Sequence, residues 1–131
     1  MEKRKNKTGS FKVLIVDDNT AFRQLLKLTL DRFLSIEIYE AADGEEALQK
    51  IGSLRPNLIF MDYRLGGENG LELTKQVKDR YPNIIVIILT GYNLPEYGES
   101  SSLDADYVFL KNWSNIENIP TLVESILPTR L

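Results

Sequence analysis

Two adjacent carboxylates, Asp17 and Asp18, follow a run of four aliphatic residues, Val13 to Val16. Neighbouring like charges repel each other, and each carboxylate resists leaving water. Acids placed directly after a buried-looking segment therefore predict that a cation binds beside them. The chain has no cysteine and no histidine in 131 residues, so any chemistry at this place must rest on carboxylates, hydroxyls and lysine.

Further polar residues follow other apolar runs. Asp62 ends LIFMD, Thr90 ends IIVIILT and Lys111 follows YVFL. If these runs are parallel strands of one sheet, their carboxyl ends meet at the edge where open α/β sheets bind ligands. One lysine is too little positive charge for three carboxylates, and the hard ion Mg²⁺ suits oxygen ligands and a phosphate. The pattern predicts a magnesium site.

The same side chains suit the transfer of a phosphoryl group. A metal ion and a lysine neutralise phosphoryl oxygens, and the hydroxyl of Thr90 donates a hydrogen bond to them. The remaining carboxylate is then the nucleophile, because aspartyl phosphate is a known covalent intermediate of such sites.

The elements that must position these residues alternate along the chain in the pattern typical of βαβ units. We expect strands over Val13–Val16, Ile36–Ala41, the end of Arg55–Asp62, Asn83–Thr90 and Tyr107–Leu110. We expect helices over Thr20–Leu34, Asp43–Ile51, Gly70–Tyr81 and Asn118–Leu127. Right-handed crossovers then predict an α/β, flavodoxin-like, doubly wound sheet of five parallel strands in the order 2-1-3-4-5.

The chain length predicts one domain, over residues 11–128, after a flexible basic tail, residues 1–10. The glycine- and serine-rich segment 93–106 predicts a short loose helix or a loop. A net charge of −3 argues against nucleic-acid binding by this domain, because such binding is led by basic patches. No apolar run is long enough for a membrane span and no signal peptide is recognisable, so we expect a cytoplasmic protein.

Four motifs together resemble the receiver domain of two-component response regulators, over Phe11 to about Leu127. They are VDDN, LIFMDYRLGGENGLEL, ILTGY and ADYVFLKN. The resemblance implies that Asp62 accepts a phosphoryl group from the phosphohistidine of a sensor histidine kinase or from a phosphotransfer protein. It implies a phosphorylation-driven switch that changes affinity for a downstream protein partner, in a protein that is not a turnover enzyme.

The resemblance also implies roles for the other site residues. Asp18 would bind Mg²⁺ directly, Asp17 partly through water, and the backbone carbonyl of Arg64 would complete the protein ligands with Asp62. Thr90 and Lys111 would contact the phosphoryl oxygens, while Gly91 would leave room for them.

Three positions depart from the usual receiver pattern. Asn112 stands where receivers usually have a proline in a cis peptide bond, so the loop after the lysine is expected to differ in shape. Val108 stands where family members tend to carry an aromatic residue that moves with the threonine, which calls that form of switching into question. Gly66-Gly67 replaces a proline-containing turn, which should loosen the loop after the acceptor.

Several alternatives remain open from the sequence. Asp17, Asp18 and Asn19 would on the simplest interpretation only cap a helix. A pseudo-receiver would keep the fold and bind partners without phosphorylation, and an Mg²⁺-dependent phosphatase or phosphotransferase would use the same acids as an enzyme. The sequence also leaves open whether the chain acts alone, as part of a longer regulator or as a homodimer.

Overall fold

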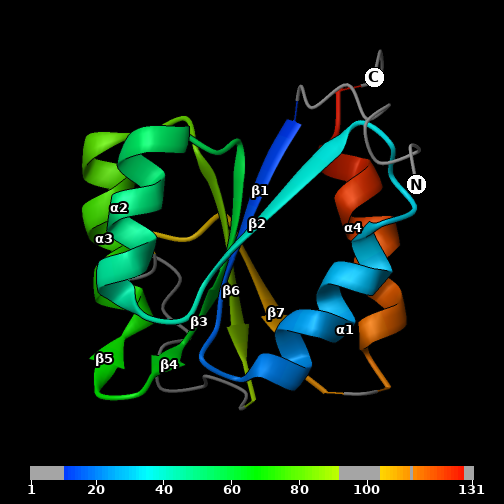
Figure 1. Ribbon diagram of the computed structural model, residues 1–131, viewed down its shortest axis with the longest axis horizontal. Coiled ribbons are helices and arrows are strands. Elements are labelled where there is room, and N and C mark those ends of the chain that lie inside the picture. Colours follow the sequence, from blue (N-terminus) through cyan, green and yellow to red (C-terminus); the bar gives the residue numbers. More distant parts are fainter. Residues whose placement is uncertain (1–10, 92–103, 113, 129–131) are drawn as a thin grey trace.

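The computed structural model describes residues 11–91, 104–112 and 114–128. Its main sheet has five parallel strands, in the spatial order β2 (Ile36–Ala41), β1 (Phe11–Val16), β3 (Leu58–Asp62), β6 (Ile85–Thr90) and β7 (Tyr107–Leu110) (Figure 1). Numbered as main-sheet strands along the chain, this is the order 2-1-3-4-5. The predicted fold class is confirmed.

Helices cover both faces of this sheet (Figure 1). One face carries α1 (Thr20–Leu30) and α4 (Ile119–Ile126), which follows the short 3₁₀ helix η4 (Ile116–Asn118), while α2 (Gly44–Leu54) and α3 (Gly70–Arg80) lie on the other. Since both faces are covered, successive residues of a strand enter different hydrophobic clusters. Val13 and Ile15 pack toward α1, whereas Leu14 and Val16 pack toward α2.

This double burial explains the continuous aliphatic runs that predicted the strands. All four side chains from Val13 to Val16 are fully buried, and burying each one contributes about 2 kcal/mol to folding. The helices in turn present one apolar face to the sheet, as Phe22, Leu26 and Leu30 of α1 do.

Two helix ends differ from the prediction by three residues or more, while the other helix bounds agree to within one residue. Helix α1 ends at Leu30, not at Leu34, because the chain must turn for Ile36 to pair with Phe11 at the start of β2. The amide of Phe33 donates to the carbonyl of Leu30 at 3.0 Å in this turn. Helix α2 continues to Leu54, three residues past the predicted Ile51, before a left-handed residue at position 55 ends it.

The loop after the predicted acceptor forms a second, two-stranded sheet. Strands β4 (Arg64–Leu65) and β5 (Glu68–Asn69) are antiparallel, with Gly66 and Gly67 between them. Gly66 has φ +62°, which a glycine adopts without strain. Where the sequence predicts only a loosened loop, the structure therefore has a tight hairpin.

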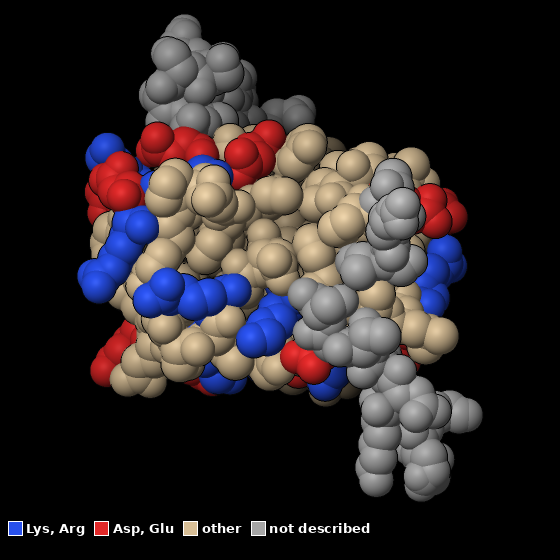
Figure 2. All heavy atoms as spheres, turned by 90° about the horizontal axis from the view of Figure 1, so that it is seen from above, with Lys and Arg blue, Asp and Glu red and all other residues tan. Residues whose placement is uncertain are grey.

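The strands of the main sheet all begin at one end of the molecule and finish at the other (Figure 1). Figure 2 views the end where they begin, on which Lys and Arg side chains stand among a mostly uncharged surface with separate Asp and Glu side chains. The acids predicted to form the site lie at the opposite end. Over the described ranges, no helix is both long and apolar enough to cross a membrane.

The predicted basic tail, residues 1–10, lies outside the described residues, as does most of the glycine- and serine-rich segment. Helix α4 begins one residue after the predicted Asn118 and has Pro120 in its first turn, where the missing amide hydrogen costs nothing.

Candidate functional site

The three predicted acids meet at the carboxyl end of the sheet. Strands β1 and β3 are neighbours with Val16 opposite Met61, so Asp17 and Asp62 follow at the same level. Carboxylate oxygens of Asp17, Asp18 and Asp62 all lie within 4.8 Å of one another. Asp17 is fully buried and Asp62 is 6% exposed, while Asp18 is exposed.

Lys111 brings the positive charge of the site. Its Nζ lies 2.7 Å from Oδ2 of Asp17 and 3.4 Å from Oδ2 of Asp62. Lys111 directly follows strand β7. The backbone amide of Lys111 donates to the carbonyl of Thr90 at the end of the neighbouring strand, which places the lysine beside the acids. The ring of Phe22 lies below the ammonium, 4.7 Å from its centroid, a distance at which a cation is attracted to the face of an aromatic ring.

This environment alters the acidity of Asp62. Burial and, next in size, the negative charge of Asp17 together raise its pKa from 3.8 to about 7, although the ammonium of Lys111 opposes the rise. Without an added cation, a large fraction of Asp62 is therefore protonated at neutral pH. A cation bound among the acids would favour the ionised carboxylate.

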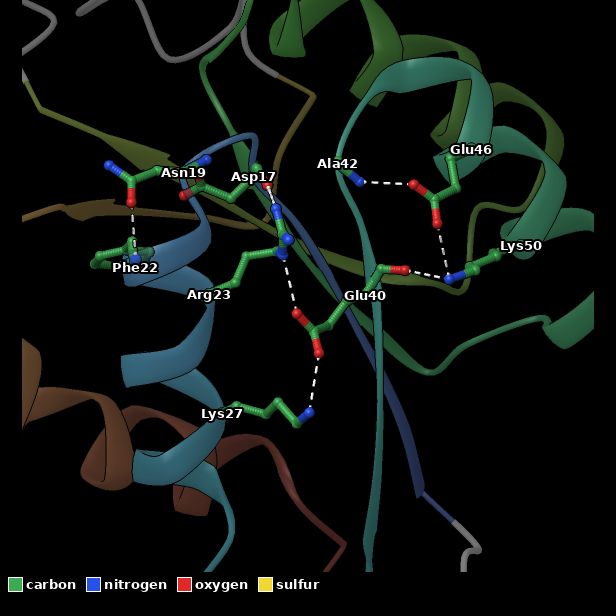
Figure 3. A network of polar contacts seen from close by, with 9 residues as sticks. All are labelled: Asp17, Asn19, Phe22, Arg23, Lys27, Glu40, Ala42, Glu46 and Lys50. Carbon is green, nitrogen blue, oxygen red and sulfur yellow. Dashed lines mark hydrogen bonds and ion pairs between the residues drawn. The ribbon is translucent and has the colours of Figure 1, made fainter.

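Asp17 takes part in the start of α1, but Asn19 is the cap. Oδ1 of Asn19 accepts the amide of Phe22 at 3.0 Å, and Oδ1 of Asp17 accepts the amide of Asn19 at 2.9 Å (Figure 3). Oδ2 of Asp17 is buried, and its partner is the ammonium of Lys111 at 2.7 Å. Helix capping thus accounts for one oxygen of Asp17 and leaves the other directed at the acid cluster.

These observations fit a hard divalent cation. The donors are all carboxylate oxygens, and the one ammonium that pairs with Asp17 and Asp62 cannot balance three carboxylates. Ions of the Mg²⁺ type prefer such oxygen ligands, whereas the thiolate and imidazole ligands of other metals do not occur in this chain.

A cavity of about 390 Å³ opens beside Asp62 and Lys111. It is lined by residues from four segments that are far apart in the sequence: Asn19, Ala21, Phe22, Asp62, Tyr63, Arg64, Gly91, Lys111 and Asn112. A Cβ atom added to Gly91 would meet nothing within 4 Å. The predicted acceptor and the predicted lysine therefore border one open space.

Two further predicted residues lie at the same edge of the sheet. Thr90 is 2% exposed and follows Leu89, which pairs with Asp62 across β6 and β3. Arg64 is in the hairpin that follows the acceptor, and its guanidinium lies 5.6 Å from the ring centroid of Tyr63. Phosphoryl contact by the hydroxyl of Thr90 and metal binding by the carbonyl of Arg64 remain predictions.

The loop after the lysine is shaped by asparagines. No cis peptide bond occurs in the described chain, which includes Lys111 and Asn112. Oδ1 of Asn112 accepts the amide of Asn115 at 2.7 Å, and Nδ2 of Asn115 donates to the carbonyl of Leu110 at 2.8 Å. These side chains close the turn at the position where the receiver pattern usually has a proline. Val108, another departure from the receiver pattern, is 48% exposed.

The sequence did not single out two side chains of this region, Phe22 and Arg23. The ring of Phe22 lies in the core and also contacts Lys111. Arg23 hydrogen-bonds to the carbonyl of Asp17 and to Glu40. The available signal for Arg23 was Glu40, an acid near the end of a predicted strand that pairs with two basic residues of the helix before it.

Comparisons with known proteins agree with this geometry. A family profile described as "Response regulator receiver domain" matches residues 13–124. Sporulation initiation phosphotransferase F of Bacillus subtilis is 35% identical over 120 residues, which are 91% of this chain and 95% of that protein. A protein-glutamate methylesterase/protein-glutamine glutaminase 3 of Hahella chejuensis is 39% identical over 82 residues, so the match spans only 24% of its length.

Solved structures show the same fold. The response regulator protein TrrA of Thermotoga maritima, in complex with Mg²⁺ and BeF, superposes with a TM-score of 0.78 at 32% identity, over 89% of this chain and 99% of that one. The chemotaxis response regulator CheY4 of Vibrio cholerae gives a TM-score of 0.77 at 31% identity, over 89% of this chain and 98% of that one.

Proposed function

Because this chain belongs to the response regulator receiver family, we propose that it is a Mg²⁺-dependent receiver whose Asp62 carries the phosphoryl group. Receivers are phospho-accepting modules of two-component signalling and not enzymes that turn over an external substrate. The observation that carries the assignment of Asp62 is that three acids meet beside Lys111, and that of these acids Asp62 lines the open cavity.

Asp62 is the nucleophile of the proposed reaction. One of its carboxylate oxygens attacks the phosphorus of the donor, a new O–P bond forms, and the P–N bond of a phosphohistidine breaks. The electron pair of that bond remains on the imidazole, which takes up a proton from solvent. Asp62 must be ionised to attack, so with its raised pKa a cation at the site would increase the reactive fraction near neutral pH.

Mg²⁺ is the cofactor that suits the donor set. When bound, it neutralises the carboxylates and the phosphoryl oxygens together. Asp17, Asp18 and Asp62 would hold it through carboxylate oxygens, and Arg64 through its backbone carbonyl. The structure of TrrA with Mg²⁺ and BeF, at 32% identity, supports this choice of metal.

Lys111 and Thr90 would stabilise the phosphorylated state. The ammonium of Lys111 already lies 3.4 Å from Asp62, so it is in position to pair with a phosphoryl oxygen. Thr90 would donate a hydrogen bond from the neighbouring strand end, and Gly91 would leave the group room. Phosphorylation adds a charge of about −1.5 to −2, which favours one of two conformations and so changes the affinity for a partner protein.

The partners follow from the donor chemistry. We propose a sensor histidine kinase or a phosphotransfer protein upstream and a protein partner downstream. We further propose that residues 11–128 form the receiver domain and that residues 1–10 precede it as a separate basic segment.

The experiment that tests the function measures the intact mass of the protein after incubation with Mg²⁺ and acetyl phosphate. We expect the wild type to gain the mass of one phosphoryl group, and Asp62→Asn or chelation of Mg²⁺ to abolish the gain. Asp79→Asn is the matched control, because Asp79 is an exposed aspartate of α3 with only a surface ion pair. A wild type that gains no mass would instead indicate a pseudo-receiver.

A further inference from the structure

The guanidinium of Arg23 joins the acid cluster to the edge of the sheet. Its Nη1 donates to the carbonyl oxygen of Asp17 at 2.6 Å, and its Nε donates to Oε1 of Glu40 at 2.9 Å (Figure 3). Both side chains are largely buried, with 15% of Arg23 and 29% of Glu40 exposed. Two hydrogen bonds from one rigid group fix its orientation better than a single bond would.

The hydrogen bond from Arg23 to the carbonyl of Asp17 restrains the backbone of both Asp17 and Asp18. The carbonyl of Asp17 belongs to the peptide unit that joins it to Asp18, and a peptide unit is planar. The amide of Asp17 is already held by the carbonyl of Ala41 at 3.1 Å. Arg23 therefore completes the restraint of the backbone from which both carboxylates project.

Glu40 anchors the other side of the guanidinium. Lys27 of the same helix also pairs with Glu40, at 3.0 Å, and Lys50 of α2 donates to the carbonyl of Glu40 (Figure 3). Lys50 in turn pairs with Glu46 at 3.0 Å. The network thus ties helices on both faces of the sheet to β2, next to the end of β1.

We propose that Arg23 is a positioning residue for metal binding: by bridging the carbonyl of Asp17 and the carboxylate of Glu40, it holds the carboxylates of Asp17 and Asp18 where they bind Mg²⁺. This rests on the proposed function, since it concerns the metal of that site. Outer-shell partners of this kind commonly change metal affinity by 10- to 100-fold.

The sign of the effect separates positioning from simple electrostatics. Removing a positive charge near a cation site strengthens cation binding by Coulomb's law. Removing a residue that orders the ligands weakens it. Arg23→Gln therefore has opposite expected effects under the two explanations, and a residue that only stabilises the fold would change the melting temperature without changing the affinity of the folded protein.

The test is a Mg²⁺ titration of the unphosphorylated protein, followed by the NMR shift of the amide of Asn19, which donates to Asp17. We expect Arg23→Gln to raise the dissociation constant about tenfold. Lys27→Gln is the matched control. Lys27 also pairs with Glu40, but among the residues drawn in Figure 3 it contacts only Glu40 and not Asp17. We expect Lys27→Gln to change the dissociation constant for Mg²⁺ less than about twofold.

Arg23→Lys serves as the second variant if Arg23→Gln does not fold. It keeps the charge but lacks the fork that bridges two acceptors, so it should also weaken Mg²⁺ binding. The proposal would be overturned if Arg23→Gln had the same dissociation constant for Mg²⁺ as Lys27→Gln, or bound Mg²⁺ more tightly than the wild type. Failure of acetyl phosphate to label Asp62 would refute the proposed function alone, because the titration needs no phosphorylation.

Discussion

Replacing Asp62 by asparagine should change how the stability of the protein depends on pH in the absence of metal. Burial raises the pKa of Asp62 from 3.8 to about 7, with the charge of Asp17 adding to the rise and Lys111 opposing it. In the unfolded chain the carboxyl returns to its ordinary pKa. Between these two values, the folded protein keeps a proton that the unfolded chain has lost.

The sign and size of the effect follow from this difference in bound protons. Stability falls with rising pH wherever the folded state binds more protons, so the wild type loses stability as pH rises from 3.8 to about 7. Each pH unit corresponds to about 1.4 kcal/mol. The full loss is about 4 kcal/mol at most, and above the folded pKa no further loss from Asp62 is expected.

The assay is urea unfolding of wild type and Asp62→Asn in the presence of a chelator, at several values from about pH 5 to about pH 8. The difference between the two proteins removes the contribution of titrating groups that do not interact with Asp62. From the low to the high end of this range, the free energy of unfolding of Asp62→Asn should rise by about 3 kcal/mol relative to that of wild type. The reason is that wild type loses the stability provided by the proton that Asp62 binds in the folded state, whereas asparagine has no such proton.

Two parallel stability curves would refute the reasoning, since they would show that the Asp62 carboxyl titrates normally in the folded protein. Mg²⁺ provides a second check. It should stabilise the wild type more at about pH 8 than at about pH 5, because it binds the ionised acids, and it should stabilise Asp62→Asn less at both values.

Two more substitutions test the structure around the site. Phe22→Leu removes the ring 4.7 Å from the ammonium of Lys111, and we expect labelling by acetyl phosphate to slow about fivefold, equivalent to about 1 kcal/mol. Gly70→Ala places a Cβ atom 2.0 Å from the carbonyl oxygen of Asp62, so we expect a loss of more than about 2 kcal/mol in the free energy of unfolding, measured in urea.

Each of these has a matched control. Phe11→Leu removes a ring of similar burial, since Phe11 is 7% and Phe22 is 6% exposed, but Phe11 stands at the opposite end of β1. Labelling at the same rate in both leucine variants would contradict the role of the Phe22 ring. Gly67→Ala adds a Cβ that meets nothing within 4 Å, and a loss as large as that of Gly70→Ala would show that the close approach is not the cause.

The strands and the strand order could be predicted because double burial leaves a direct trace in the sequence. Runs such as Val13–Val16 are continuous rather than alternating only when both faces of a sheet are covered. The end of α1 could not be predicted in this way. Phe33 continues the apolar pattern of the helix, but the pairing of Phe11 with Ile36 requires the chain to turn first, and that pairing is set by a distant segment.

The same distinction between local sequence and tertiary packing holds for the site. The sequence by itself determined which acids meet, because parallel strands that end in Asp17 and Asp62 must present them at one edge of the sheet. Only the tertiary structure decided what surrounds them: the burial that raises the pKa of Asp62, the ring of Phe22 beside Lys111, and the reach of Arg23 to the carbonyl of Asp17. Burial and side-chain contacts depend on how whole layers pack, and a local pattern of residues carries no record of which partner lies opposite.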